Sequence, residues 1–429
     1  MDTQASGKKG IFDWYFKSNL LLRILIGLFA GAVVGLIVGP KIAVVAPLGD
    51  LFVRLLKMIV VPVVFLSLVG GAASISPARI GKIGIKIVLY YMITTVIAVV
   101  IGLIFANILK PGMGLNLASA AAAGKELKQP NLIQTLLAIV PTNPVESMAK
   151  GDILPIIFFA LVFGIALSYV AESSDARLKE GAVSLLKWFD TAAEAMYKVV
   201  HGVLQYAPIG VFALIALVFG QQGAKAFGPL GMVTATVYIA LIVHLVVTYG
   251  GVLVLNKLSF LKFLKGSKEA MLTAFVTRSS SGTLPVTLQN TEDNLGCPRS
   301  ISSFTLPLGA TVNMDGTCIY QGVCALFVAF AIGQDLTLAQ QMTVVITATL
   351  ASIGTAGVPG AGAIMLLMVL NSIGLPVVEG TPVAMAYGMI LGIDALLDMG
   401  RTGLNVTGDM VGTVIVSKSE KELDMSKWS

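Results

Sequence analysis

The stretch GIDALLDMGRTGLNVTGD, residues 392–409, carries polar and ionic side chains within an apolar segment, and six of them recur at helical intervals. They are Asp394, Asp398, Arg401, Thr402, Asn405 and Asp409, at relative positions 0, 4, 7, 8, 11 and 15. At about 100° per residue of an α-helix, all six lie within a stripe about 100° wide. The segment is therefore predicted to be an apolar helix with one ionic face.

This ionic face needs a partner. A charge at the centre of a membrane helix costs at least about 2.5 to 3.5 kcal/mol on insertion scales, so the face must meet protein, water or a ligand. Buried ion pairs that lock helices together are one interpretation. Three carboxylates against one guanidinium nevertheless leave an excess of negative charge, and that excess calls for cations.

The composition of the chain indicates that this helix lies in a membrane. Of 429 residues, 56% are hydrophobic and only 12% are charged, against about 25% charged in soluble domains. We expect one membrane body without a separate aqueous domain. The net charge of +6 falls in short loops, where it sets orientation and does not indicate nucleic acid. The three cysteines and two histidines lack the spacing of disulfide scaffolds, zinc sites or haem sites.

Six apolar spans precede the last third of the chain: 20–39, 51–73, 83–109, 132–170 (broken at Pro141 and Pro144), 192–219 and 231–255. Each is long enough for a membrane helix of about 20 residues. The first span is too long for a signal peptide and has no cleavage site, so it is predicted to be retained. Lys and Arg recur after every second span, which predicts a multi-pass protein with both termini in the cytoplasm. Arg54 and Lys57 are expected to extend to the outer interface.

The last third does not have the pattern of plain membrane helices. Residues 271–295 and 342–370 are apolar but are interrupted by SSSGTLP (279–285) and SIGTAGVPG (352–360), which predicts two re-entrant hairpins. Each is followed by a helix with a polar interruption, NMDGT (313–317) and DMGRTGLNVTGD (398–409), which predicts two broken helices. Close helix packing is the alternative for either Ser/Gly stretch alone. A pair of interrupted segments with inverted topology indicates the midplane site of a secondary transporter.

The NMDGT segment supplies further oxygen ligands. Asn313, Asp315 and Thr317 carry amide, carboxylate and hydroxyl oxygens, and Gly316 is expected to weaken the helix and free carbonyl groups. A helix cap is the alternative reason for an Asp-Gly pair. Hard oxygen ligands are suited to Na⁺, by the same preference that hard divalent ions show.

Four motifs together resemble those of one family. RSSSGTLP (278–285), TLPLGATVNMDGT (305–317), GTAGVPGAG (354–362) and GIDALLDMGRTGLNVTGD (392–409) are similar to motifs of the dicarboxylate/amino acid:cation symporters. The likeness is greatest to the archaeal homologues of the neuronal glutamate transporters, and it extends from residue 54 to the end. It implies an all-α integral membrane protein with eight transmembrane helices, two re-entrant helical hairpins and inverted repeats.

The resemblance also implies a homotrimer with an elevator mechanism. Residues 1–75 would form scaffold helices 1 and 2, and residues 111–220 would form scaffold helices 4 and 5. Residues 76–110 would be transport-domain helix 3. Residues 221–429 would be the transport-domain core, with helix 6, hairpin 1, helix 7, hairpin 2, helix 8 and a cytoplasmic tail. The transport domain would slide across the membrane against a static scaffold.

Carried over by motif, Arg401 would hold the side-chain carboxylate of the substrate and Asp398 its α-ammonium. The whole substrate site would comprise Arg278, Ser280, Met314, Thr317, Val358, Gly362, Asp394, Asp398, Arg401, Thr402 and Asn405. Sodium would be bound by Gly309, Asn313, Asn405 and Asp409, by Thr311, Ser352, Ile353 and Thr355 with Met314 nearby, and by Tyr91, Thr94, Thr95, Asn313 and Asp315. Thr95, Cys318 and Gly403 depart from the archaeal pattern, and Gly403 bears on helix rigidity and affinity.

These observations predict a symporter of a prokaryotic cell membrane that takes up L-aspartate or L-glutamate with Na⁺, and not an enzyme. The alternative is a proton-coupled glutamate/aspartate or C4-dicarboxylate symporter, because buried carboxylates also form proton relays. Against it, neither His201 nor His244 lies near a motif. A channel would need a continuous polar pore. An intramembrane enzyme would need an activated nucleophile, and Ser280 with Asp398 lacks a histidine base.

Overall fold

The computed structural model describes residues 20–73, 82–115, 139–353 and 357–428, together with Ser18, Leu117, Leu137 and Thr355. Across these residues the regular structure is helical and contains no strand. Residues 132–136, the first part of the fourth predicted span, lie outside the described residues. The predicted all-α class is confirmed for the part of the chain that is described.

The helices of the first two thirds follow the predicted apolar spans. They are α2 (Leu20–Val38), a 3₁₀ segment (Gly39–Val45), α3 (Ala46–Ala73), α4 (Lys82–Leu109), α6 (Pro144–Lys150), α7 (Ile153–Ala171), α8 (Ala176–Gln222), a 3₁₀ segment (Gly223–Ala226), α9 (Phe227–Val243), a π-helical segment (His244–Tyr249) and α10 (Gly250–Leu255). In the described ranges, five stretches are long and apolar enough to cross a membrane: Leu22–Gly70, Ile83–Leu109, Ala176–Leu255, Arg299–Ala331 and Pro382–Ser419.

Two helix starts show what local sequence decides. The break in the fourth span occurs where Asn143 accepts hydrogen bonds from the backbone N–H groups of Val145 and Glu146, with Pro144 in the first turn. Helix α8 begins at Ala176, well before the predicted residue 192. Asp175 caps it by accepting from the backbone N–H of Arg177. The predicted start was wrong because hydropathy does not detect the charged first half of this 47-residue helix.

The last third contains two pairs of helices joined by short connections. They are α11 (Phe260–Thr277) with α12 (Ser280–Gln289), and α15 (Leu338–Ser352) with α16 (Ala361–Ser372). The members of each pair pack on one another, and Arg278 turns the first pair in the left-handed conformation, at φ 56°. This arrangement has the helix–turn–helix form expected of the predicted hairpins. Their re-entrance into the membrane stays a prediction.

The remaining helices are α13 (Arg299–Val312), α14 (Asp315–Ala331) and α17 (Pro382–Ser419), with a π-helical segment at Asn290–Asn294 and a 3₁₀ turn at Met425–Lys427. The predicted break at NMDGT is present, because Asn313 is extended between α13 and α14. The predicted second break, at 398–409, is wrong, since α17 is one helix of 38 residues. Its polar side chains project from one face, where they meet other helices without interrupting the backbone ladder.

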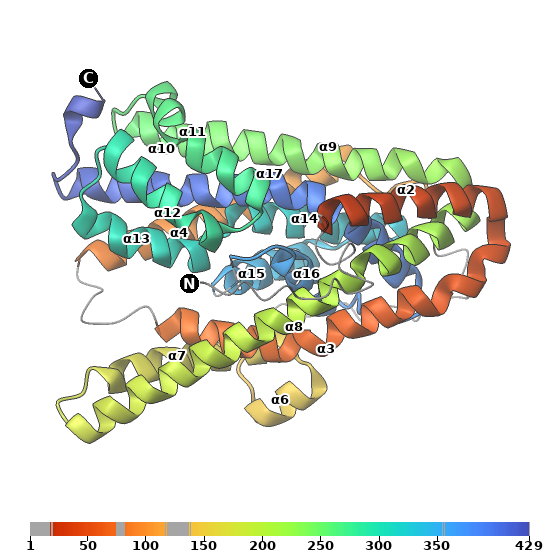
Figure 1. Ribbon diagram of the computed structural model, residues 1–429, viewed down its shortest axis with the longest axis horizontal. Helices are drawn as coiled ribbons and strands as arrows, with labels where there is room; N and C mark the ends of the chain where they lie inside the picture. The colour runs from red at the N-terminus through yellow and green to blue at the C-terminus, as the bar shows by residue number, and fades with distance from the viewer. Residues whose placement is uncertain are drawn as a thin grey trace, which may run out of the picture.

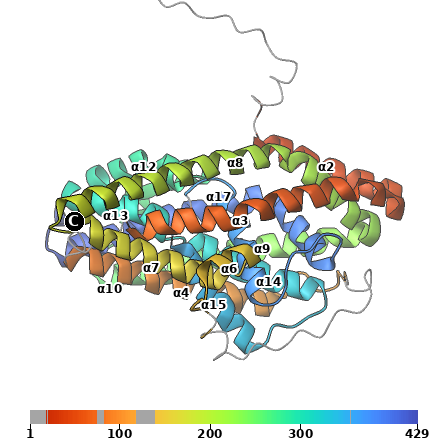
Figure 2. The ribbon, with the colours of Figure 1, turned by 90° about the horizontal axis from the view of Figure 1, so that it is seen from below.

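The helices pack in two groups. One contains α2, α3, α7 and α8, and the other contains α4, α9 and the helices from α11 to α17. Figures 1 and 2 both show α3 and α8 running side by side along one flank of the molecule. The groups meet where α2 and α8 contact α17 and where α3 contacts α16. Every residue of α14 is buried, so this helix lies at the centre of the second group.

Candidate functional site

The interruption between α13 and α14 brings backbone and side chains together against α17. Asn405 of α17 accepts a hydrogen bond from the backbone N–H of Gly316 at 2.7 Å, and its amide donates to Thr317 Oγ1 at 3.2 Å. A Cβ at Gly316 would lie 2.3 Å from the carbonyl oxygen of Arg401. Gly316 is therefore required for the close approach of α14 to α17, a role the sequence did not reveal.

The ionic face of α17 is buried along its length. Arg401 is 1% exposed, and the other five polar side chains of this face are buried as well. The guanidinium donates from Nε to Asp398 Oδ1 at 2.9 Å and from Nη1 to Asp394 Oδ1 at 2.8 Å. Its carbon also lies 4.3 Å from the centroid of the Tyr320 ring. Arg401 is thus held rigidly by two carboxylates and an aromatic face.

The connections of the two helix pairs meet directly above this cluster. The carbonyl of Gly357 accepts hydrogen bonds from Ser279 Oγ at 2.7 Å and from the backbone N–H of Ser281 at 3.1 Å. The backbone N–H of Gly360 donates to Asp398 Oδ2 at 3.2 Å. One connection is therefore bonded both to the opposite connection and to the ionic face of α17.

A small cavity lies beneath these tips. Its lining is Arg278, Ser280, Met314, Thr317, Thr355, Gly357, Val358, Ala361, Gly362, Asp398, Arg401, Thr402 and Asn405. The enclosed volume of about 10 Å³ is room for one water molecule. A larger ligand does not fit this volume, and the contacts of Ser279 and Ser281 with the Gly357 carbonyl hold the two tips together.

The cavity brings together ten of the predicted substrate residues. The exception is Asp394, which lines a neighbouring cavity of about 40 Å³ and reaches the site through Arg401. The predicted tip from Val358 to Gly362 includes Ala361, which also lines the cavity. Gly357 and the ring of Tyr320 were not predicted. Gly357 lies within a motif that was singled out, whereas no sequence signal pointed to Tyr320.

The predicted cation residues Asp409, Asn313 and Gly309 are adjacent. Asn313 donates from Nδ2 to Asp409 Oδ1 at 2.9 Å, and a Cβ at Gly309 would lie 2.4 Å from the same oxygen. The side-chain oxygen of Asn313, Oδ1, is buried and has no hydrogen-bond partner among the described residues. A buried oxygen acceptor without a donor beside a carboxylate fits a cation of hard character.

Asp315 lies in a second polar cluster. Its Oδ1 accepts from Thr95 Oγ1 at 2.7 Å, and its Oδ2 accepts from the Tyr249 hydroxyl at 2.7 Å. His244 Nε2 lies 3.2 Å from the same Oδ2. The expectation that neither histidine lies near a motif is therefore wrong for His244, because α9 packs on α14 and brings together residues far apart in sequence.

The hydroxyl groups of the other predicted sodium ligands donate to backbone carbonyls, and all of these contacts except that of Tyr91 are local. Thr94 Oγ1 donates to the Tyr91 carbonyl at 3.2 Å, Thr311 Oγ1 to the Leu308 carbonyl at 3.0 Å and Ser352 Oγ to the Thr349 carbonyl at 2.7 Å. Tyr91 donates from its hydroxyl to the Thr305 carbonyl at 3.0 Å. Thr355 Oγ1 similarly donates to the Ala351 carbonyl at 2.5 Å, and Ile353 follows α15 as its C-cap. Among the described residues, no hydrogen bond joins Thr311 to Ser352 or Thr355.

The three departures from the archaeal pattern have separate surroundings. Thr95 keeps its hydroxyl on Asp315, and Cys318 is buried with its thiol toward the Ala348 carbonyl at 3.4 Å. Gly403 is part of the unbroken α17, and a Cβ there would meet nothing nearer than 3.6 Å. It lines an apolar cavity of about 250 Å³ on the side of α17 away from Arg401. Gly403 therefore leaves space, and no close approach requires it.

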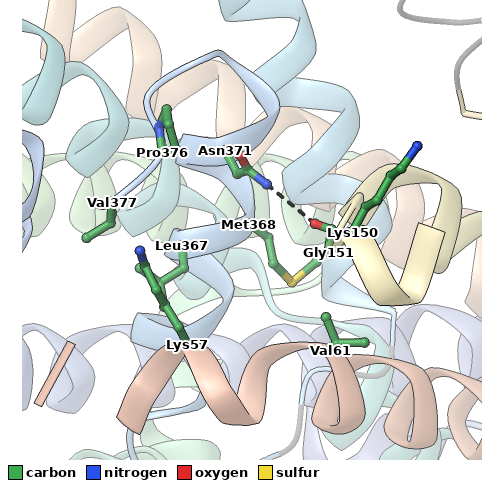
Figure 3. Close-up of a pocket in the computed structure, with 9 residues that line it drawn as sticks. All are labelled: Lys57, Val61, Lys150, Gly151, Leu367, Met368, Asn371, Pro376 and Val377. Atoms are coloured by element: carbon green, nitrogen blue, oxygen red, sulfur yellow. Dashed lines mark hydrogen bonds between the residues drawn. The ribbon is translucent and has the colours of Figure 1, made fainter. Parts of the chain in front are cut away.

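A larger cavity lies between the two groups of helices. It holds about 310 Å³ and is lined by Lys57 and Val61 of α3, Lys150 and Gly151 beside α6, and Leu367, Met368 and Asn371 of α16, with Pro376 and Val377. In Figure 3 the Asn371 amide points across it to the Gly151 carbonyl, 3.5 Å away. This cavity is bounded by both groups, so any relative movement of them must reshape it.

Near this cavity, α3 is also linked to the segment before α17. Arg54 donates from Nε to Glu379 Oε1 at 2.9 Å, and a second bond joins the same two groups at 2.5 Å. The hydrogen bond from Arg54 lowers the pKa of Glu379 below its usual value. Arg54 was expected only to extend to the interface, and the structure gives it this partner as well.

Comparisons with known proteins agree on one group. A family profile described as the sodium:dicarboxylate symporter family matches residues 20–419. The chain is 37% identical over 423 residues to a proton/sodium-glutamate symport protein of Geobacillus stearothermophilus, which covers 96% of this chain and 97% of the relative. It is 37% identical to a proton/glutamate-aspartate symporter of Escherichia coli strain K12, over 89% of this chain and 86% of that protein. A C4-dicarboxylate transport protein of Rhizobium leguminosarum is 34% identical, over 98% and 93% respectively.

Proposed function

The chain belongs to the sodium:dicarboxylate symporter family, and from this premise we propose that it couples uptake of L-aspartate or L-glutamate to Na⁺. Transport, and not catalysis, is the activity of this family and of the named relatives. The relatives include proteins named for glutamate, for aspartate and for C4-dicarboxylates. Substrate and coupling ion must therefore be argued from the site.

The observation that carries the proposal is Arg401 beside Asp398 on the wall of the cavity. Asp394 and Asp398 use three of the five guanidinium N–H groups through the bonds at 2.8, 2.9 and 3.4 Å. Two N–H groups remain for a substrate carboxylate, which matches guanidinium geometry. Asp398 supplies a carboxylate for an ammonium group. Both charges of an acidic amino acid have a counterpart.

The same pair favours an amino acid over a C4-dicarboxylate. A dicarboxylate has no ammonium, so Asp398 would face it as an unpaired negative charge in a buried site. Like-charge juxtaposition in an interface disfavours the wrong partner by several kcal/mol. We expect succinate to compete poorly with aspartate.

Sodium coupling is supported by oxygen ligands near Asp409 and Asp315. The unpaired Asn313 Oδ1 provides an acceptor that a proton carrier would not require. The hydroxyl groups of Thr95 and Tyr249 donate hydrogen bonds to the Asp315 carboxylate. Proton coupling remains the second candidate, and His244 beside Asp315 is the observation that favours it.

For the transport step we propose two movements. Separation of the tips at Ser279, Ser281 and Gly357 admits the substrate, and sliding of the group that contains α17 against α3 and α8 exchanges access between the two sides. In this proposal residues 1–75 and 111–220 are the scaffold, and residues 76–110 and 221–429 are the transport domain. The scaffold assembles a homotrimer in a cell membrane, with both termini cytoplasmic.

Reconstituted protein tests the substrate and the ion together. Proteoliposomes are expected to accumulate labelled aspartate under an inward Na⁺ gradient, and faster when the interior is negative. Aspartate carries −1, and the potential opposes it by about 2.3 kcal/mol per 100 mV, so acceleration requires more than one accompanying cation. Uptake driven by a pH gradient in sodium-free buffer would overturn sodium coupling. Equal competition by succinate would overturn the amino acid assignment.

A further inference from the structure

The π-helical segment His244–Tyr249 interrupts the regular helix between α9 and α10. Well under 1% of residues in globular proteins are π-helical, and such turns occur frequently at functional sites. Its first and last residues reach the same atom. His244 Nε2 lies 3.2 Å and the Tyr249 hydroxyl 2.7 Å from Oδ2 of Asp315. All three side chains are fully buried.

The π-helical geometry explains how two residues five apart share one face. In a regular α-helix, residues five apart differ by about 140° around the axis. In a π-helix the hydrogen bonds run between residues five apart, so those residues stack on successive turns. The turn therefore aligns the imidazole of His244 and the hydroxyl of Tyr249 toward one carboxylate. Their rings also pack edge to face, with centroids 4.7 Å apart.

The second imidazole nitrogen of His244 also has a partner within hydrogen-bond distance. Thr248 Oγ1 lies 3.3 Å from His244 Nδ1, and a hydroxyl can donate there. A neutral imidazole that accepts at Nδ1 donates from Nε2, toward Asp315. The other carboxylate oxygen, Oδ1, accepts from Thr95 of α4 at 2.7 Å. Three side chains on two elements thus fix the orientation of Asp315.

An unpaired acceptor close to Asp315 in the sequence points to a ligand in this region. Asn313 precedes Asp315 by two residues, and its Oδ1 is buried without a hydrogen-bond partner among the described residues. Carboxylates that bind metal ions are themselves oriented by hydrogen bonds from groups that do not touch the ion, and changing such groups typically costs 10–100-fold in metal affinity. His244 has this relation to Asp315.

We infer that His244 is a positioning residue for the coupled cation. It does not line the substrate cavity, and it acts by holding the Asp315 carboxylate in the orientation that binds Na⁺. The inference rests on the proposed sodium coupling and deepens it. The inference predicts different effects on the affinities for Na⁺ and for the amino acid. Loss of the His244 donor weakens Na⁺ binding and leaves the amino acid contacts at Arg401 and Asp398 in place.

The test compares two substitutions of this residue. His244→Leu removes the donor, whereas His244→Gln keeps an N–H group near the position of Nε2. The readouts, in proteoliposomes, are the Na⁺ concentration for half-maximal aspartate uptake and the aspartate KM at saturating Na⁺. We expect His244→Leu to raise the Na⁺ value about 10- to 100-fold, with the aspartate KM changed less than about twofold. His244→Gln should return the Na⁺ value to within about threefold of the parent.

Two further variants keep the test decisive. His201→Leu changes the other histidine, which is exposed on α8, and should alter neither value. Thr248→Val removes the hydroxyl beside Nδ1 and should also raise the Na⁺ concentration for half-maximal uptake. It replaces His244→Leu as the test if the Leu variant does not fold. An unchanged Na⁺ value in His244→Leu, or in Thr248→Val where Leu does not fold, overturns the inference alone. So does an equal rise in the aspartate KM. A parent protein without Na⁺ dependence overturns the proposed function and the inference with it.

Discussion

Replacing Arg401 with Met removes the charge of the guanidinium and keeps an unbranched side chain. In the structure this group is 1% exposed, holds Asp394 and Asp398 at 2.8 and 2.9 Å, and stacks on Tyr320. The substitution leaves two buried carboxylates without their counter-charge. We therefore expect two separate losses, one of substrate affinity and one of stability.

The magnitudes follow from the burial of the pairs. Removing one partner of a buried charge pair at a binding site typically costs about 2–5 kcal/mol, which is a fall in aspartate affinity of about 30-fold to several-thousand-fold. Leaving the two carboxylates unpaired should destabilise the protein by about 3–5 kcal/mol. Adding Asp394→Asn to Arg401→Met removes one of the two charges. That double variant should recover part of the stability but none of the affinity.

Labelled aspartate uptake and thermal unfolding of the purified protein measure the two losses separately. Asp394→Asn alone completes the cycle and reports how strongly the two side chains are coupled. An Arg401→Met protein that takes up aspartate with an affinity within threefold of the parent would refute the assignment of Arg401 to the substrate carboxylate. Recovery of affinity in the double variant would show that electrostatic collapse of the site, and not a lost contact, caused the defect.

Three further predictions address the substrate ammonium group, the proposed sliding movement and the glycines that pack at α17. Asp398→Asn should weaken competition by every amino acid tested, acidic or neutral, and an effect on Na⁺ dependence alone would reassign Asp398 to a cation site. Lys57→Cys with Leu367→Cys joins α3 to α16 across the cavity of Figure 3. After replacement of the native cysteines (Cys297, Cys318 and Cys324), a short thiol crosslinker should stop uptake reversibly, and undiminished uptake by crosslinked protein would contradict a sliding domain. Gly403→Ala should stabilise the protein by about 0.5–1 kcal/mol, visible as a higher unfolding temperature. Gly316→Ala should lower it, because its Cβ would lie 2.3 Å from a carbonyl oxygen, and the opposite order would contradict the packing described.

The parts of the site that the sequence predicted are those in which spacing along one element decides geometry. The polar residues of α17 recur at helical intervals, so their common face could be calculated from the sequence alone. The break at Asn313 was predictable because polar groups and Gly316 in an apolar segment disfavour a continuous helix there. Motif resemblance then brought in the residues of the two tips.

The parts that were not predicted depend on contacts between elements, or on helical segments that are not apolar. The first turns of α8 are held by the Asp175 cap and are not apolar. The unbroken α17 shows that polar side chains on one face need not end a helix. The contact of His244 with Asp315 joins residues 71 positions apart, and no spacing rule carries that information. The π-helical turn His244–Tyr249 also has no signature in the hydropathy pattern or in the motifs.

The charges of the buried cluster connect substrate binding to cation binding. Asp394 and Asp398 share Arg401, whereas in the described part of the chain Asp315 and Asp409 have no Lys or Arg partner and accept hydrogen bonds from Thr95, Tyr249 and Asn313. Hydrogen bonds satisfy these oxygens but do not cancel their charge, and an acidic amino acid adds one more negative charge. In the proposed function, cations at Asp315 and Asp409 would offset this excess, and their binding would lower the electrostatic cost of binding aspartate. Because such coupling is reciprocal, bound aspartate would raise the cation affinity by the same factor. A site with four buried carboxylates and one buried guanidinium therefore favours joint transport of substrate and cations over transport of the substrate alone.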